Sequence, residues 1–184
     1  MIRNSTTAWG WPSIALHWLG AALVIVLLAH GWWMTHLTPR HDRLANYGLH
    51  AALGYDFLAL LILRLLWRWI NPVPALPGQA WERYAAMAGH TALYILMFAC
   101  TLTGWALAGT FRNALSRDLL GLALPAIYQS QDRAMHELFE NSHKILAYLI
   151  AALVVVHVLG ALRQHLIKHN DVLRRMLVGA KSSI

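Results

Sequence analysis

Cysteine and acidic residues are both scarce in this 184-residue chain, which holds one cysteine and eight aspartate or glutamate residues. The single cysteine, Cys100, lies within an apolar run, so a disulfide framework and a thiolate metal cluster are excluded. Neither a CxxC nor an HExxH motif occurs, so the usual ligand spacings of a zinc site are missing. Charged residues make up 12% of the chain, whereas hydrophobic residues make up 58% and nine residues are tryptophan. This composition is typical of a protein that resides largely in a lipid bilayer.

Four long apolar runs account for most of the chain. The first run contains no small-residue cleavage signal, so we interpret it as a retained helix and not as a signal peptide. The basic residues lie between and after the runs, as anchors at a membrane surface do, and form no patch for nucleic acid. We therefore predict an all-α fold, a transmembrane four-helix bundle that forms one membrane domain over residues 1–184. The predicted helices cover residues 13–34, 47–70, 85–108 and 137–165, with one long connection at 110–136 whose segment LLGLALP is expected to cover the membrane surface.

Lysine and arginine are distributed unequally between the two ends of the predicted bundle. With the N-terminus inside, nine basic residues fall on the inner side and six on the outer side. Cytoplasmic ends carry an excess of Lys and Arg, so this count favours cytoplasmic termini and a periplasmic connection at 110–136. The inner set is Arg3, Arg64, Arg68, Arg83, Arg163, Lys168, Arg174, Arg175 and Lys181, and the outer set is Arg40, Arg43, Arg112, Arg117, Arg133 and Lys144.

Two histidines, His143 and His157, lie within the last apolar run. They are fourteen residues apart, which on a helix is an advance of about 21 Å and a rotation to within roughly 40° of four full turns. Both imidazoles therefore point to the same side from opposite ends of one span. A single membrane histidine is as readily explained by a hydrogen bond to a carbonyl of a neighbouring helix. Two on one face favour ligand binding inside the bundle.

The predicted topology sorts six histidines into two depths. The inner level holds His17, His90 and His157, and the outer level holds His30, His50 and His143. His17 and His30 are thirteen residues apart, so the second is turned about 140° away from the first and does not face the same cavity. If each level holds one iron between two imidazoles, the partner of His157 is His17 or His90, and the partner of His143 is His50 or His30. Spacing alone leaves both choices open.

Arg64 lies fourteen residues after His50 and repeats the same-face geometry of the other pair. An arginine near the end of a span commonly extends to the lipid head groups. The alternative is that Arg64 neutralises an anionic group of a ligand that the histidines hold.

Paired imidazoles at each depth, in an apolar and aromatic interior, suit a large flat macrocycle better than a zinc ion. A haem with both axial positions filled has no open position for a substrate, so it passes electrons. The pattern therefore predicts transmembrane electron transfer. A histidine-lined metal transporter is the distant alternative, because scattered membrane histidines can also relay ions.

The order of motifs along the chain resembles the bacterial cytochrome b561 family. The resemblance rests on His17-Trp18, His50 with Gly54, ILRLLWR followed by NPVPALP, LGLALP, His143 with His157, and the closing KHNDVLRRM. It implies a multi-pass protein of the bacterial inner membrane with two haem b groups. It also implies that His17 pairs with His157 on the inner haem iron and His50 with His143 on the outer one, which leaves His30 and His90 without a ligand role.

The same resemblance implies an activity. One characterised activity of the family is a superoxide:ubiquinone oxidoreductase, in which superoxide is oxidised on the periplasmic side and ubiquinone is reduced in the membrane. The alternative is a cytochrome b carrier subunit that links a soluble redox protein to the quinone pool. No catalytic residue and no quinone pocket is assigned. Outer basic residues that could attract an anion are Arg112, Arg117, Arg133 and Lys144, and nearby acidic residues that offset them are Asp118, Asp132, Glu137 and Glu140.

Overall fold

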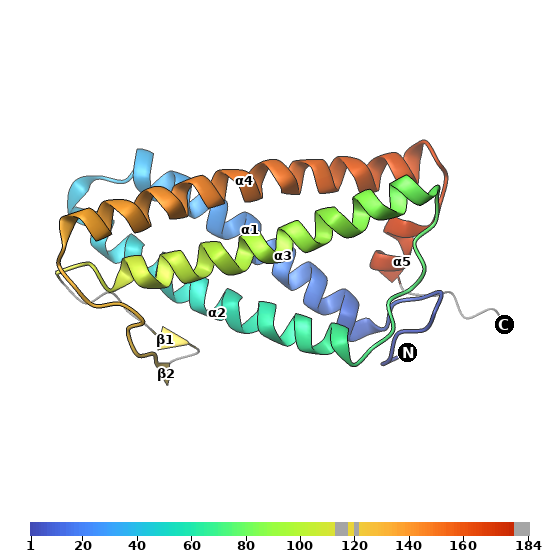
Figure 1. The fold of residues 1–184 in the computed structure, drawn as a ribbon, viewed down its shortest axis with the longest axis horizontal. Helices are drawn as coiled ribbons and strands as arrows, with labels where there is room; N and C mark the ends of the chain where they lie inside the picture. The colour runs from blue at the N-terminus through green and yellow to red at the C-terminus, as the bar shows by residue number, and fades with distance from the viewer. Residues whose placement is uncertain (113–117, 120–121, 179–184) are drawn as a thin grey trace.

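Four long helices run alternately up and down in the computed structural model, which describes residues 1–112, 118–119 and 122–178 (Figure 1). They are α1 (Trp11–His36), α2 (Arg43–Trp69), α3 (Ala80–Ala108) and α4 (Arg133–Leu166). All four are long and apolar enough to cross a membrane. At 26 to 34 residues, they measure about 39–51 Å, which exceeds the roughly 30 Å hydrocarbon core. The predicted all-α transmembrane four-helix bundle is therefore confirmed.

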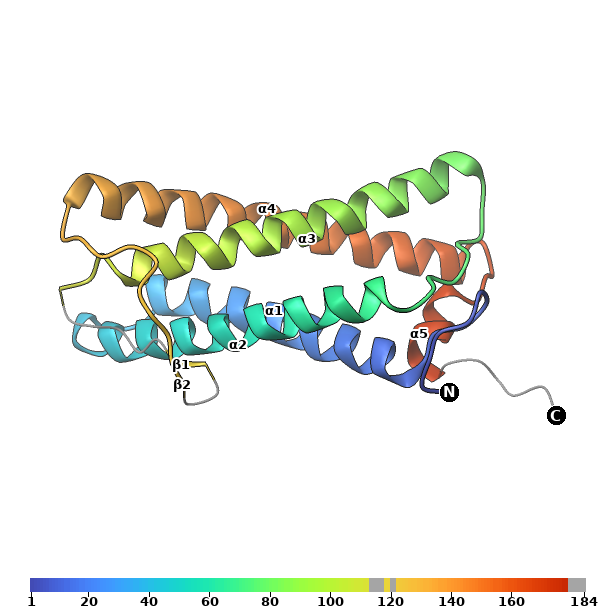
Figure 2. The ribbon, with the colours of Figure 1, turned by 60° about the horizontal axis from the view of Figure 1, so that its bottom comes forward.

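The helices form two hairpins, α1 with α2 and α3 with α4, which pack across each other (Figure 2). The N-terminus and the short helix α5 (Val172–Val178) lie at one end of the bundle, called the α5 end here. The opposite end, called the β end, carries the 3-10 turn Arg40–Asp42 and the antiparallel strands β1 (Asp118–Leu119) and β2 (Leu122–Ala123). Each long helix therefore connects the two ends.

Three of the helices, α2, α3 and α4, begin four or five residues before the predicted positions, and polar groups cap the first turns of α3 and α4. At the start of α3, the Glu82 carboxylate accepts a hydrogen bond from the backbone N–H of Gln79 over 3.0 Å, as in a capping box. At the start of α4, the Asp132 carboxylate accepts from the backbone N–H of Ala134 over 2.8 Å. The predicted starts at residues 85 and 137 are too late, because they were placed where the apolar runs begin and leave out the polar first turns.

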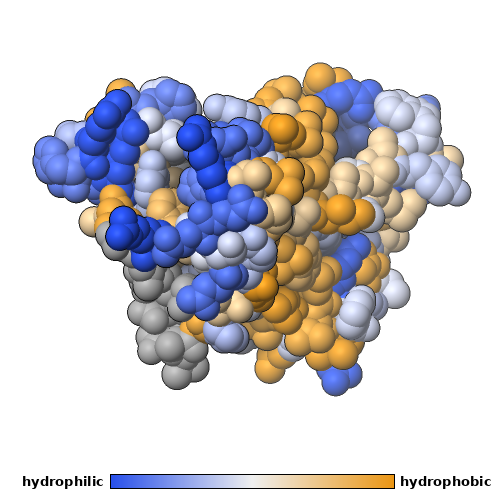
Figure 3. All heavy atoms as spheres, turned by 60° about the vertical axis from the view of Figure 1, so that its left-hand side comes forward, coloured by the Kyte–Doolittle hydropathy of each residue, from blue (hydrophilic) through white to orange (hydrophobic). Residues whose placement is uncertain are grey.

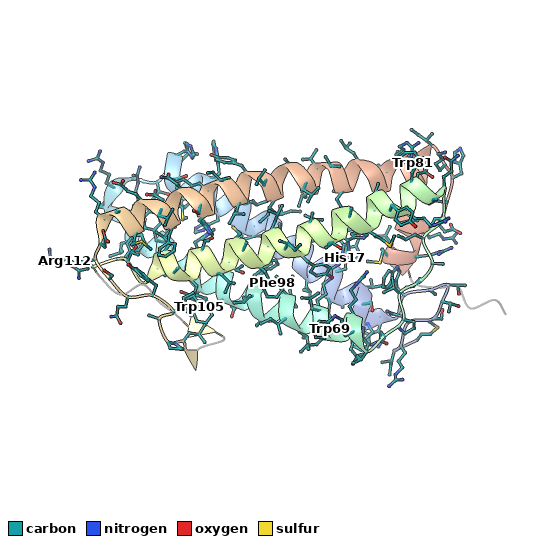
Figure 4. The ribbon with its side chains drawn as sticks, in the orientation of Figure 1. His17, Trp69, Trp81, Phe98, Trp105 and Arg112 are labelled. Atoms are coloured by element: carbon teal, nitrogen blue, oxygen red, sulfur yellow. The ribbon has the colours of Figure 1, made fainter. Side chains whose placement is uncertain are left out.

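The buried core lies midway along the bundle and draws on all four helices. Val24, Phe57, Leu61, Leu93, Met97, Cys100 and Ile150 form its buried cluster. Outside this cluster most large apolar side chains are exposed, and Figure 3 shows them as a continuous hydrophobic flank beside a hydrophilic end. An apolar flank of this extent fits a lipid environment. Tryptophans lie near both ends, with Trp69 and Trp81 at the α5 end and Trp105 at the β end (Figure 4).

The α5 end is closed by segments that come together from three parts of the chain. The Asn4 side chain donates to the carbonyl of Pro72 over 2.9 Å and accepts from the Ser13 hydroxyl over 2.7 Å. The Trp18 indole Nε1 donates to the carbonyl of Met176 in α5 over 2.6 Å. The sequence pattern predicts no helix there, because the seven residues of α5 are too few to produce a clear helical period.

At the β end, the connection between α3 and α4 folds back on the bundle. The Trp105 indole Nε1 donates to the carbonyl of Pro125 over 3.0 Å, and the Thr110 hydroxyl lies 2.6 Å from Nδ1 of His136. The predicted membrane-surface segment LLGLALP falls partly outside the described residues. Its described part contributes to the two-residue strand pair.

Candidate functional site

Six membrane histidines gather into two groups, one toward each end of the bundle. Near the α5 end, the ring centre of His157 lies 6.3 Å from that of His17 and 5.2 Å from that of His90. Near the β end, the ring centre of His50 lies 6.1 Å from that of His143 and 5.8 Å from that of His30. The members of each group are those that the predicted topology placed at one depth.

A layer of buried apolar side chains separates the two groups. Ile150 in α4 is 5% exposed and lies seven residues from each of the two histidines of that helix. Phe57 of α2 and Met97 of α3 belong to the same buried cluster. Ions and water find no polar partner in such a layer. The two histidine groups are thus separate sites.

The distances within the groups can be compared with those of imidazoles on a haem iron. Metal–imidazole bonds are about 2 Å long and each ring centre lies about 1 Å behind its nitrogen, so two axial rings have centres roughly 6 Å apart. The separations of 6.3 Å for His17 and His157 and 6.1 Å for His50 and His143 fit that value. The 5.2 Å separation of His90 and His157 is too short.

His30 sits in a different way beside the β-end pair. Its ring is stacked on that of His50 with 19° between the planes, so the two rings face each other. Its Nε2 lies 3.3 Å from the Asn46 side-chain oxygen. A metal binds in the plane of an imidazole ring, at a nitrogen, so the stacked arrangement suits packing and not a shared iron.

His143 is held in a defined tautomer. Its Nδ1 donates a hydrogen bond to the backbone carbonyl of Cys100 over 2.9 Å. This bond leaves Nε2 unprotonated and free to bind a metal, which is the usual arrangement behind a metal-bound imidazole. Sequence reasoning missed the role of Cys100, because a backbone carbonyl leaves no signal in the side-chain pattern.

His17 is held from the opposite side, by Arg64 of α2. Nη2 of Arg64 donates to Nδ1 of His17 over 2.9 Å, and the guanidinium lies 5.4 Å from the ring centre of Tyr94. Arg64 therefore points into the bundle at the histidine group and not toward the head groups. A guanidinium cannot accept a hydrogen bond, so this contact leaves the proton of a neutral His17 on Nε2.

An ion-paired cluster near the α5 end was also missed. The Glu82 side chain is 5% exposed, its carboxylate accepts from Nη1 of Arg163 over 2.8 Å, and Nζ of Lys168 lies 3.8 Å away. It joins the start of α3 to the end of α4. The sequence does contain one glutamate at the end of the bundle where two basic residues lie. Glu82 and Arg163 are 81 residues apart, however, so their pairing could not be inferred from spacing.

Among the described residues, no group of three or more His, Cys, Asp or Glu side chains is arranged to hold a metal ion. The two histidine pairs instead supply two imidazoles each, which is the protein ligand set of a haem with both axial positions filled.

Comparison with known proteins identifies the family of the chain. A family model described as prokaryotic cytochrome b561 matches residues 8–179, a range that includes both histidine groups. The chain belongs to the prokaryotic cytochrome b561 family. It is 35% identical over 185 residues to cytochrome b561 homolog 2 of Escherichia coli (strain K12), with 98% of this chain and 96% of the relative covered. It is 28% identical over 174 residues to cytochrome b561 homolog 1 of the same organism, with 89% of this chain and 93% of the relative covered.

Membership confirms the resemblance inferred from the motifs. The chain is a bacterial membrane protein of the cytochrome b561 family, with a role in electron transfer and with haem b as the cofactor that the family implies. Family membership therefore supports the prediction of electron transfer and not the alternative of metal transport.

Proposed function

We propose that this cytochrome b561 is a dihaem superoxide:ubiquinone oxidoreductase with both termini in the cytoplasm. His17 and His157 would hold one haem iron near the α5 end, and His50 and His143 would hold a second near the β end. The observation that carries the proposal is the pair of ring-centre separations, 6.3 and 6.1 Å, at the two levels of one bundle.

A bound haem b supplies reversible one-electron chemistry at each level. The chain's own residues orient the ligands and exclude water and ions at these sites. The carbonyl of Cys100 fixes the tautomer of His143, as the 2.9 Å bond shows. The buried cluster with Ile150 and Phe57 excludes water and ions between the levels, so that charge crosses this layer as electrons.

The stoichiometry follows from the proposed substrates. Each superoxide anion gives up one electron and leaves as dioxygen. Two electrons and two protons convert one ubiquinone to ubiquinol, so two superoxide anions are consumed for each quinone reduced. Entry from the periplasmic side corresponds to the β end, and the basic excess at the opposite end supports cytoplasmic termini.

The charges at the β end bear on the choice of electron donor. Nε of Arg133 is paired with Glu137 over 2.8 Å, and Nζ of Lys144 with Glu140 over 2.6 Å. Both cations are thereby neutralised, while the exposed Arg112 lies at the outermost part of this end (Figure 4). Arg40 and Arg43 lie at the same end, so this end keeps basic groups that can attract a small anion or an acidic protein surface. The second candidate is a carrier subunit that receives electrons from a redox protein docked there.

Two measurements on purified protein test the proposal. A reduced-minus-oxidised absorbance spectrum with haem extraction should give two haem b groups per chain, and protein without haem would overturn the electron-transfer assignment. The dihaem protein is then mixed with a superoxide source and a ubiquinone analogue. Quinone reduction by the isolated chain supports the oxidoreductase. Reduction only after a second protein is added establishes the carrier.

A further inference from the structure

Each imidazole of the β-end pair lies directly against a glycine of the neighbouring helix. A Cβ atom built on Gly104 of α3 would lie 2.9 Å from Cε1 and 3.1 Å from Nδ1 of His143. A Cβ atom built on Gly31 of α1 would lie 3.2 Å from Cε1 of His50. Alanine is normally more favourable than glycine inside a helix. The two glycines therefore remove atoms where the rings need the space.

The surroundings of these rings fix their rotation as well as their position. The plane of the His50 ring makes an angle of 88° with that of His143. His143 lies along one turn of α3, with its Nδ1 bonded to the carbonyl of Cys100 and its edge on Gly104. His50 lies on Gly31 and is stacked against His30, the preceding residue of α1. Each ring is thus confined on two sides by a single turn of a neighbouring helix.

The α5-end pair is held differently. The planes of its rings, those of His17 and His157, are 60° apart. The glycine of α1 nearest to His17 in sequence is Gly20, and a Cβ there would meet Leu60 at 3.9 Å and Arg64 at 4.0 Å. Among the described glycines, none would bring a Cβ within 4 Å of His17 or His157. Contact between a glycine and a ligand ring is therefore particular to the β-end pair.

We infer that Gly31 and Gly104 are positioning residues that hold the His50 and His143 rings at right angles on the β-end haem. The inference rests on the proposed ligation of that haem by these two histidines. Perpendicular axial rings interact equally with two perpendicular iron d orbitals. Those orbitals then lie close in energy, and the oxidised low-spin iron gives a strongly anisotropic electron paramagnetic resonance (EPR) signal. Rotation of either ring splits the orbitals and reduces the anisotropy.

The experiment compares alanine variants of the full-length protein at contacting and non-contacting glycines. Gly104→Ala and Gly31→Ala are the test variants. Gly89→Ala in α3, where nothing lies within 4 Å of the added Cβ, and Gly20→Ala in α1 are the matched controls. Haem content, low-temperature EPR spectra and the midpoint potentials of both haems are measured for each variant. The signal of the α5-end haem serves as an internal reference in every sample.

The expected result is a graded effect confined to one haem. In Gly104→Ala the β-end signal moves to lower anisotropy or that haem is lost, because the 2.9 Å clearance forces the His143 ring to move. Gly31→Ala, with a clearance of 3.2 Å, retains its haem and shows a smaller shift in the same direction. The α5-end signal and both control variants match the wild-type protein.

Other outcomes overturn the inference. An unchanged β-end signal in both test variants would show that the glycines do not set the ring angle. Equal losses of haem in Gly104→Ala and Gly89→Ala would show that the effect is a general destabilisation of α3. A wild-type chain with fewer than two haems would instead contradict the proposed function, so the two failures are distinguishable before any variant is compared.

Discussion

Arg64 of α2 donates a hydrogen bond to Nδ1 of His17 in α1, with 2.9 Å between the two nitrogens. The contact brings a permanent positive charge beside a proposed haem ligand, inside the bundle. A cation at this position favours the reduced haem, because the oxidised haem carries one more positive charge. For His17 to bind iron through Nε2, its proton must move to Nδ1, and Arg64 must then turn to another acceptor. A haem propionate or a quinone oxygen is an acceptor of the right charge.

Replacement of Arg64 should therefore lower the midpoint potential of the α5-end haem. We expect Arg64→Gln to lower it by on the order of 50 mV, with the β-end haem unchanged. Arg64→Lys keeps the charge and should retain most of the wild-type potential. Arg83→Gln, which replaces an exposed arginine at the start of α3, is the matched control. Spectroelectrochemical titration measures both haems at once, and an unchanged potential together with unchanged quinone kinetics in Arg64→Gln would remove this role.

Loss of a single ligand should remove a single haem. We expect His143→Ala to lose the β-end haem and His157→Ala to lose the α5-end haem, because one remaining imidazole binds the macrocycle less firmly. Haem extraction and the reduced-minus-oxidised spectrum count the cofactors. Retention of both haems in either variant would contradict the assignment.

The neighbouring histidines provide the matched controls for that prediction. His90 lies 5.2 Å from His157 and His30 lies 5.8 Å from His50, yet the ring geometry gives neither a ligand role. His90→Ala and His30→Ala should therefore keep two haems. Loss of the α5-end haem in His90→Ala, with His17→Ala unaffected, would mean that the other candidate pairing is the correct one.

The number of helices and the common face of His143 and His157 were predictable, because the first follows from the count of long apolar runs and the second from the spacing within one run. A span of this length and a fourteen-residue spacing constrain the backbone without reference to any other helix. The first turn of α4 could also have been predicted from Asp132, which has the side chain that helix N-caps prefer.

The choice of ligand partners could not be predicted in this way. His17 and His90 both lie beside His157, and only the angles at which three helices pack decide which ring lies at the separation of an axial pair. The bond from Arg64 to His17 joins residues that are 47 positions apart. The partner of each histidine depends on how the helices pack in three dimensions, and the periodicity of a single helix does not determine that packing.

The apolar layer between the two histidine groups should be sensitive to loss of volume. Ile150 is 5% exposed and Ile145, on the same helix, is 60% exposed. We expect Ile150→Ala to lower the free energy of unfolding by about 2–4 kcal/mol, because the cavity it leaves is only partly refilled. Ile145→Ala removes the same atoms from the lipid-facing surface and should cost much less. Thermal unfolding in detergent, monitored by the decrease in haem absorbance, compares the two variants. Equal losses of stability in both would mean that Ile150 does not contribute to the core.

The ion pair between Glu82 and Arg163 should stabilise the junction of α3 and α4 at the α5 end. The Glu82 side chain is 5% exposed and also caps α3, so Glu82→Gln leaves Arg163 and Lys168 without their shared carboxylate. We expect Glu82→Gln to lower the thermal unfolding midpoint by several degrees, and Glu82→Gln with Arg163→Gln to lower it by less than the sum of the single changes. The pair Arg133 and Glu137, whose side chains are 92% and 55% exposed, is the control and should show almost no coupling. Additive effects of the Glu82 and Arg163 changes would mean that Glu82 acts only as a helix cap.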